Sequence, residues 1–81
     1  MEIKINIKVG TQYIIIKEQF NKKRYKINPE LDMETQIQVC LANFISFYIE
    51  NVDMDNLTDY GYELVKQDEF NYILKGDLWI L

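Results

Sequence analysis

The chain of 81 residues is long enough for one domain with one hydrophobic core, and we expect a single domain over residues 1–81. Its residues are 48% hydrophobic, but its apolar runs are far shorter than the roughly 20 residues that cross a bilayer, so we expect a cytoplasmic protein without membrane contact. Histidine is absent and Cys40 is the only cysteine, which excludes an internal disulfide and a zinc site of the Cys/His kind.

The formal net charge of −4 is unevenly distributed along the chain. Residues 1–26 carry seven basic and two acidic side chains, whereas residues 27–81 carry two basic and eleven acidic ones. This asymmetry predicts two surfaces of opposite potential, unless unlike charges interleave in the fold and partly cancel.

Residues 2–9 alternate strictly between polar and apolar side chains. The apolar set consists of Ile3, Ile5, Ile7 and Val9. Because alternation with a period of two is typical of a strand with one buried face, this segment is predicted to be a half-buried strand.

Two further strands are predicted after the first one. Gly10 and Thr11 indicate a turn, and residues 13–20 contain a Tyr-Ile-Ile-Ile run that is apolar on both faces, as in a central strand. Residues 21–24 are predicted to form a polar turn and residues 25–27 a short third strand, so that the first third of the chain is an antiparallel meander.

Residues 28–34 contain the residue types that begin helices: an Asn or Asp suited to capping, Pro29 near the first turn, and early acidic side chains. The predicted helix covers roughly residues 30–51. Its apolar residues span an arc of about 200°, against the stripe of about 100° on an ordinary surface helix. They are Met33, Ile37, Cys40, Leu41, Phe44, Ile45, Phe47, Tyr48, Ile49 and Val52. One sheet face cannot cover this arc, so we expect either the C-terminal segment or a second copy of the chain, as in a homodimer, to cover the rest.

The last third of the chain is predicted to start with an acidic loop over residues 53–61, with one helical turn that ends near Gly61. Residues 62–67 are predicted to be a strand, and residues 70–75 and 78–81 a hairpin around Gly76 and Asp77. The alternative for residues 69–75 is a short helix capped by Asp68. The predicted fold class is therefore α+β: an antiparallel sheet of about five to six strands, with an N-terminal meander and a C-terminal hairpin, packed on one long helix.

The chain offers few groups for catalysis, and we expect no enzyme activity. Without histidine there is no imidazole base, the single serine, Ser46, falls on the polar side of the helix, and Cys40 falls within its apolar arc. Asp53 and Asp55 have the spacing of the first two ligands of a calcium loop, but the later ligand positions do not match. We therefore expect no cofactor and no metal site.

A basic stretch in the first third has the residue types of a nucleic-acid surface, because its cations suit phosphates and its rings suit bases. It consists of Lys17, Lys22, Lys23, Arg24 and Lys26 with Phe20 and Tyr25. The alternative is that the lysines of an exposed turn only keep the chain soluble and protect the sheet edge. The net negative charge favours this alternative, so direct binding of nucleic acid is not our first hypothesis.

Residues 50–69 contain seven acidic side chains and one Lys, interspersed with side chains that suit interface anchors. The candidate partner-binding residues are Asp53, Asp55, Asp59, Tyr60, Tyr62 and Glu63. Such a surface suits a basic protein partner, including a host protein that binds nucleic acid. The alternative is a solvated loop without a partner.

In length, acidity and lack of catalytic groups, the chain resembles small phage proteins that inhibit host defence, the anti-CRISPR proteins among them. The residues that carry the resemblance are Glu50, Asp53, Asp55, Asp59, Glu63, Asp68 and Glu69. The resemblance implies a non-catalytic inhibitor that occupies the nucleic-acid site of a host protein. The alternatives are a self-assembling structural or regulatory homodimer and a nucleic-acid binder that uses the basic hairpin.

Overall fold

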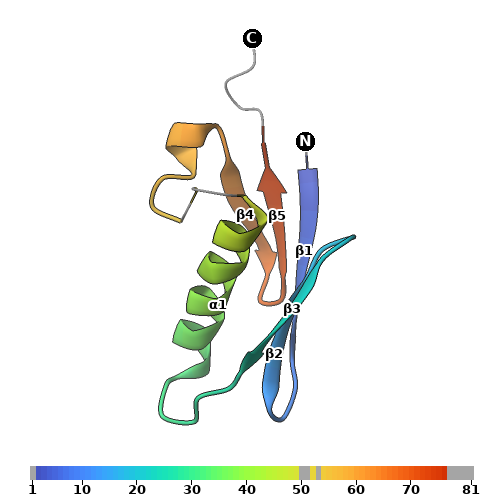
Figure 1. Ribbon diagram of the computed structural model, residues 1–81, viewed down its shortest axis with the longest axis vertical. Helices are drawn as coiled ribbons and strands as arrows, with labels where there is room; N and C mark the ends of the chain where they lie inside the picture. The colour runs from blue at the N-terminus through green and yellow to red at the C-terminus, as the bar shows by residue number, and fades with distance from the viewer. Residues whose placement is uncertain (1, 50–51, 53, 77–81) are drawn as a thin grey trace.

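The structure, a computed structural model, describes residues 2–49, 52 and 54–76 (Figure 1). In chain order the elements are β1 (Glu2–Val9), β2 (Tyr13–Lys17), β3 (Lys22–Lys26), α1 (Met33–Tyr48), a short 3-10 helix η1 (Thr58–Tyr60), β4 (Glu63–Asp68) and β5 (Asn71–Lys75). The strands form one sheet in the order β3-β2-β1-β5-β4, and every neighbouring pair is antiparallel. The predicted α+β class, with a meander, a hairpin and one helix packed on the sheet, is confirmed. The strand expected over residues 78–81 lies outside the described residues.

The alternation predicted for the first strand is confirmed in β1, the middle strand of the sheet. Ile5 and Ile7 are buried, whereas Lys4 and Lys8 are exposed on the opposite side. The two buried isoleucines pack in one core with residues of the neighbouring strands and of α1, among them Ile14, Ile16, Leu41, Phe44, Ile45, Tyr72 and Leu74. Most of the core therefore lies between the sheet and α1.

The turn between β2 and β3 differs from the prediction. β2 ends at Lys17 and β3 begins at Lys22, so the predicted turn over residues 21–24 is wrong for its last three residues. The carboxylate of Glu18 accepts hydrogen bonds from the backbone N–H of Phe20, at 3.0 Å, and from the side-chain amide of Asn21, and it closes the turn one residue after β2. Three consecutive basic residues then fit into a strand, because alternate side chains point to opposite sides of the sheet.

α1 begins after Asp32, whose carboxylate accepts hydrogen bonds from the backbone N–H groups of Glu34 and Thr35 at 2.9 and 3.3 Å. The helix ends at Tyr48, because the C-cap residue Ile49 has extended backbone angles. It is therefore shorter at both ends than the predicted helix over residues 30–51. The wide apolar arc is only partly covered, since the described residues leave Phe47 54% exposed.

In the described residues, β4 and β5 form a C-terminal hairpin, which agrees with the strands predicted over residues 62–67 and 70–75, while the further hairpin predicted with residues 78–81 lies outside the described residues. Asp68 accepts a hydrogen bond from the backbone N–H of Phe70 at 2.9 Å and two from the Asn71 side chain, which closes a tight turn. The short helix considered for residues 69–75 is wrong, because the capping-type Asp68 begins a turn instead. The predicted helical turn that ends near Gly61 is confirmed by η1, and Gly61 has a positive φ of 82°.

Candidate functional site

The sheet has one covered face and one open face. α1 lies along one side of the sheet, and residues 52 and 57 after it join the same core (Figure 1). The strand registers place the alternate residues of each strand on the opposite side, which we call the open face. These residues are Glu2, Lys4, Asn6 and Lys8 of β1; Tyr13, Ile15 and Lys17 of β2; Lys22, Arg24 and Lys26 of β3; Asn71, Ile73 and Lys75 of β5; and Glu63, Val65 and Asp68 of β4.

Six of the nine basic residues of the chain gather on the part of the open face formed by β1, β2 and β3. This basic face consists of Lys4, Lys8, Lys17, Lys22, Arg24 and Lys26, and all six side chains are exposed. By contrast, Lys23 points to the helix side, where its ammonium lies 4.2 Å from the centroid of the Phe47 ring. The strand period therefore sorts the consecutive cations of β3 between the two faces of the sheet.

The registers arrange the basic face in rows across the strands. Lys22 is opposite Lys17, and two residues along the strands Arg24 is opposite Ile15, which in turn is opposite Lys8. Neighbouring rows are about 6.6 Å apart and neighbouring strands about 4.8 Å apart, so the charges lie within the reach of one extended ligand. Because like charges directly opposite each other destabilise a sheet, the Lys17 and Lys22 pair has an energetic cost in the free protein.

The aromatic ring of Tyr13 belongs to this surface, and that of Phe20 lies in the turn next to it. Tyr13 is 36% exposed, and the guanidinium of Arg24 lies 4.8 Å from the centroid of its ring. Phe20 is 82% exposed in the turn between Lys17 and Lys22. A large apolar ring with this exposure contributes little to the core, and here it stands between two cations.

Polar side chains separate the basic face from the acidic β4–β5 turn. Asn6 donates to the side-chain carbonyl of Asn71 at 3.0 Å, and the amide of Asn71 donates to both carboxylate oxygens of Asp68 at 2.9 and 3.0 Å. Hydrogen bonds from the backbone of Phe70 and from the side chain of Asn71 lower the pKa of Asp68. Asn6 and Asn71 thus lie between Lys17 on β2 and Asp68, the nearest acid in the same row across the sheet.

The predicted acidic site is only partly brought together. Asp53 lies outside the described residues, and Asp55 and Asp59 are exposed. Tyr60, in η1, is 57% exposed. Tyr62 is half-buried and packs against the core, and Glu63 is exposed on β4, opposite Lys75. We call Asp55, Asp59, Tyr60 and Glu63 the acidic segment, and Tyr62 belongs to the core more than to this surface.

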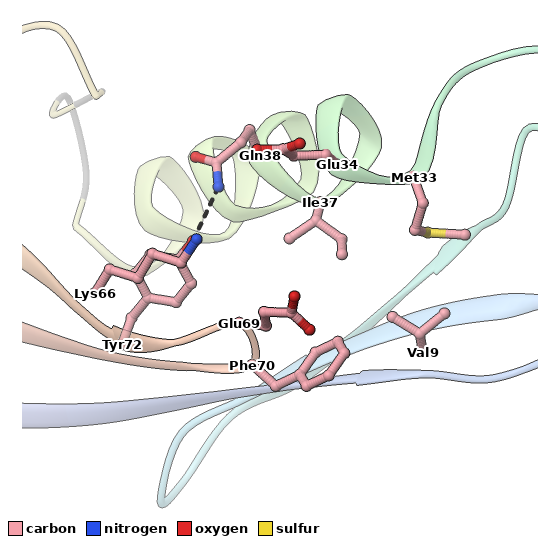
Figure 2. Close-up of a pocket in the computed structure, with 9 residues that line it drawn as sticks. All are labelled: Val9, Met33, Glu34, Ile37, Gln38, Lys66, Glu69, Phe70 and Tyr72. Atoms are coloured by element: carbon pink, nitrogen blue, oxygen red, sulfur yellow. Dashed lines mark hydrogen bonds between the residues drawn. The ribbon is translucent and has the colours of Figure 1, made fainter.

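A cavity of about 330 Å³ lies on the helix side, between α1 and the β4–β5 hairpin (Figure 2). Its lining is apolar at Val9, Ile37 and Phe70, and Gln38 donates a hydrogen bond to the Tyr72 hydroxyl at 2.9 Å. Its volume is at the low end of the range for small-molecule sites. Figure 2 shows the Glu69 carboxylate between α1 and Phe70, and Glu34 and Lys66 also line the cavity, so its lining is a mixture of apolar and charged side chains.

The remaining chemistry of the described residues is sparse. Cys40 is half-buried against the core, and burial raises the pKa of its thiol, which keeps it protonated and unreactive. Within the described ranges, no group of three or more Cys, Asp or Glu side chains could hold a metal ion. None of the described helices has the length and apolar character needed to cross a membrane.

Comparisons with protein-family models, curated proteins and solved structures found no match for the chain.

Proposed function

We propose that this chain is a non-catalytic nucleic-acid-binding domain that contacts phosphates with its basic face. The observation that carries the proposal is the gathering of six exposed cations on one face of three neighbouring strands. Phosphate contacts supply most of the affinity of nucleic-acid-binding proteins, and they require cations that reach the backbone together. The lone, half-buried Cys40 is consistent with a reducing compartment such as the cytoplasm.

Protection of a sheet edge does not account for the basic face. Lysines that prevent edge pairing belong on edge strands, as Lys22 and Lys26 do on β3. Lys4 and Lys8, however, lie on β1, the middle strand. On β1, β2 and β3 the open face has six cations and one acid, Glu2, whereas a surface selected only for solubility would intersperse both signs of charge more evenly and would not place Lys17 opposite Lys22. An anionic ligand would relieve this repulsion.

The net charge of −4 disfavours this function, but the distribution of charge along the chain supports it. The first 26 residues carry a net charge of +5 and form all three strands of the basic face. Charges are screened over about 8 Å at physiological ionic strength, so the local charge governs a ligand on this face more than the total does.

The test measures the binding of a fluorescein-labelled oligonucleotide by fluorescence anisotropy at several salt concentrations. If all six cations contact phosphates, the slope of log K against log salt is expected to be about −4 for a single strand. Lys22→Gln is expected to weaken binding and to reduce this slope by about 0.7, since one phosphate contact is lost. Lys23→Gln, next to it but on the helix side, is the matched control and should leave binding almost unchanged. Absence of salt-dependent binding, or equal losses in the two variants, would overturn the proposal.

A second candidate function is the binding of a basic protein surface by the acidic segment, as in an inhibitor of a host nucleic-acid-binding protein. It is favoured by the exposure of the Tyr60 ring between Asp59 and Glu63, since an aromatic anchor among charges is typical of interfaces. Tyr60→Ala is expected to increase the dissociation rate of a partner captured on the immobilised protein, whereas Asp59→Asn is expected to lower the association rate and its dependence on salt. Unchanged rate constants in both variants would reject this function.

A further inference from the structure

We infer that the nucleic acid bound by the basic face is single-stranded, with bases stacked on Phe20 and Tyr13. This inference rests on the proposed function and specifies its ligand. It depends on the two exposed rings, which phosphate binding alone does not require.

The two rings lie at opposite ends of the β2–β3 part of the basic face. Tyr13 begins β2 and is opposite Lys26, whereas Phe20 is in the turn that follows the Lys17 and Lys22 row. The four residue steps from Tyr13 to Lys17 cover about 13 Å of strand. A single-stranded nucleic acid that runs along β2 and β3 would therefore contact the Tyr13 ring, then the cations, and then the Phe20 ring.

Each ring is already suited to a planar ligand. The Arg24 guanidinium lies over the Tyr13 ring, 4.8 Å from its centroid, so the ring and the planar cation form one stacked pair to which a base can be added. Phe20 has 82% of its surface exposed and lies next in space to the Lys17 and Lys22 row. In the free protein this exposure is unfavourable, and it would be relieved by a flat apolar partner.

Bases provide such a partner only when they are not paired. In a duplex both faces of an internal base are stacked on neighbouring bases, whereas a single strand presents base faces to protein rings. Charge alone would favour a duplex, which has the higher density of phosphates. The rings therefore distinguish the two ligands, and they favour the single strand.

The experiment uses the full chain at low salt and compares four ligands: a 12-nucleotide single strand, a duplex of the same sequence, inorganic polyphosphate, and vesicles with anionic lipid. Phe20→Ala and Tyr13→Ala remove the rings, and Tyr13→Phe retains one. Phe47→Ala is the matched control, because Phe47 is 54% exposed and also carries a cation–π contact, but on the helix side. Circular dichroism establishes that each variant is folded.

We expect the single strand to bind more tightly than the duplex, and Phe20→Ala to weaken single-strand binding by about 5- to 150-fold. The same change should leave polyphosphate and duplex binding unaltered, Tyr13→Phe should be tolerated, and Phe47→Ala should have no effect. If Phe20→Ala has no effect while Lys22→Gln still weakens binding, the stacking inference is rejected and the proposed function stands. If no polyanion binds, both are rejected. Vesicle binding that depends on Phe20 and exceeds single-strand binding would assign the face to membranes and overturn the inference.

Discussion

The substitution Lys22→Glu should stabilise the protein while it weakens binding, because Lys22 lies directly opposite Lys17 in the sheet. Flexible side chains let the two ammonium groups separate to about 7 Å, where two like charges repel by about 0.6 kcal/mol in water. Screening over about 8 Å reduces this repulsion to about 0.25 kcal/mol at physiological salt. Replacing repulsion by attraction therefore raises the free energy of unfolding by about 0.5 kcal/mol.

The gain should depend on salt in a defined way. At 0.01 M ionic strength the screening length is about 30 Å, so the same reversal contributes about 1 kcal/mol. For a domain of this size, these energies correspond to increases in Tm of about 2 to 4 °C at physiological salt and about 4 to 8 °C at low salt. Differential scanning calorimetry at the two salt concentrations measures both increases.

Lys23→Glu is the control for this prediction. Lys23 is opposite Ile16 and lies 4.2 Å from the Phe47 ring centroid, so its replacement removes a cation–π contact worth about 0.5 to 1 kcal/mol at an exposed site. Its Tm should therefore fall. A Tm for Lys22→Glu that does not rise at low salt, or that rises equally at both salt concentrations, would refute the inferred repulsion on the basic face.

Three further results are expected. Burial, and to a lesser extent the nearby Cys40, raises the pKa of Tyr25 to about 12, so the stability that its neutral hydroxyl contributes is present below pH 10 and is lost between pH 10 and 12. Tyr25→Phe should flatten the dependence of the free energy of unfolding on pH in that range. The same pH dependence in both proteins would show that Tyr25 does not cause the loss. The hydrogen bonds from the side chain and then the backbone of Thr35 lower the pKa of Asp32, so its contribution is present above about pH 3.9 and is lost as the pH falls further. Asp32→Asn should remove part of the loss of helical dichroism below pH 4, and the same loss in both proteins would contradict the assigned cap. Phe44 is fully buried, and Phe44→Ala should cost about 3 to 5 kcal/mol and leave the chain largely unfolded at 25 °C by urea titration, whereas a near-normal unfolding midpoint would show that the site repacks.

The fold was largely predictable because its main elements follow from local patterns. The alternation in residues 2–9 gives the buried side of β1, Asp32 begins α1 through its side-chain carboxylate, and Gly61 ends η1 through its positive φ. The turn predicted at Gly76 and Asp77 lies at the border of the described residues, and the turn that the structure shows in this part of the chain precedes it. The side chain of Asp68 closes an earlier turn with Phe70 and Asn71, and this depends on how β5 pairs with β1 as well as β4.

The basic face was not predictable as a unit, although each of its residues was visible. Lys22 and Arg24 were assigned to a turn, where side chains have no common direction, whereas in β3 they point to the same side. Lys4 and Lys8 join them only because β1 pairs with β2 and occupies the middle of the sheet. The alternation of residues 2–9 already predicts that Lys4 and Lys8 point to the same side of a strand. This feature of the sequence indicated part of the basic face.

The measurement that tests the central claim most directly is a titration of the isotope-labelled protein with a single-stranded 12-nucleotide oligomer, followed by amide chemical shifts in NMR spectra. We expect the largest shifts on the open face and in the β2–β3 turn, at residues such as Lys8, Ile15 and Phe20. The exposed helix residue Val39 and the acidic segment at Tyr60 should shift little. Shifts concentrated on α1 or around Tyr60, with the open face unaffected, would contradict the claim that the basic face binds nucleic acid.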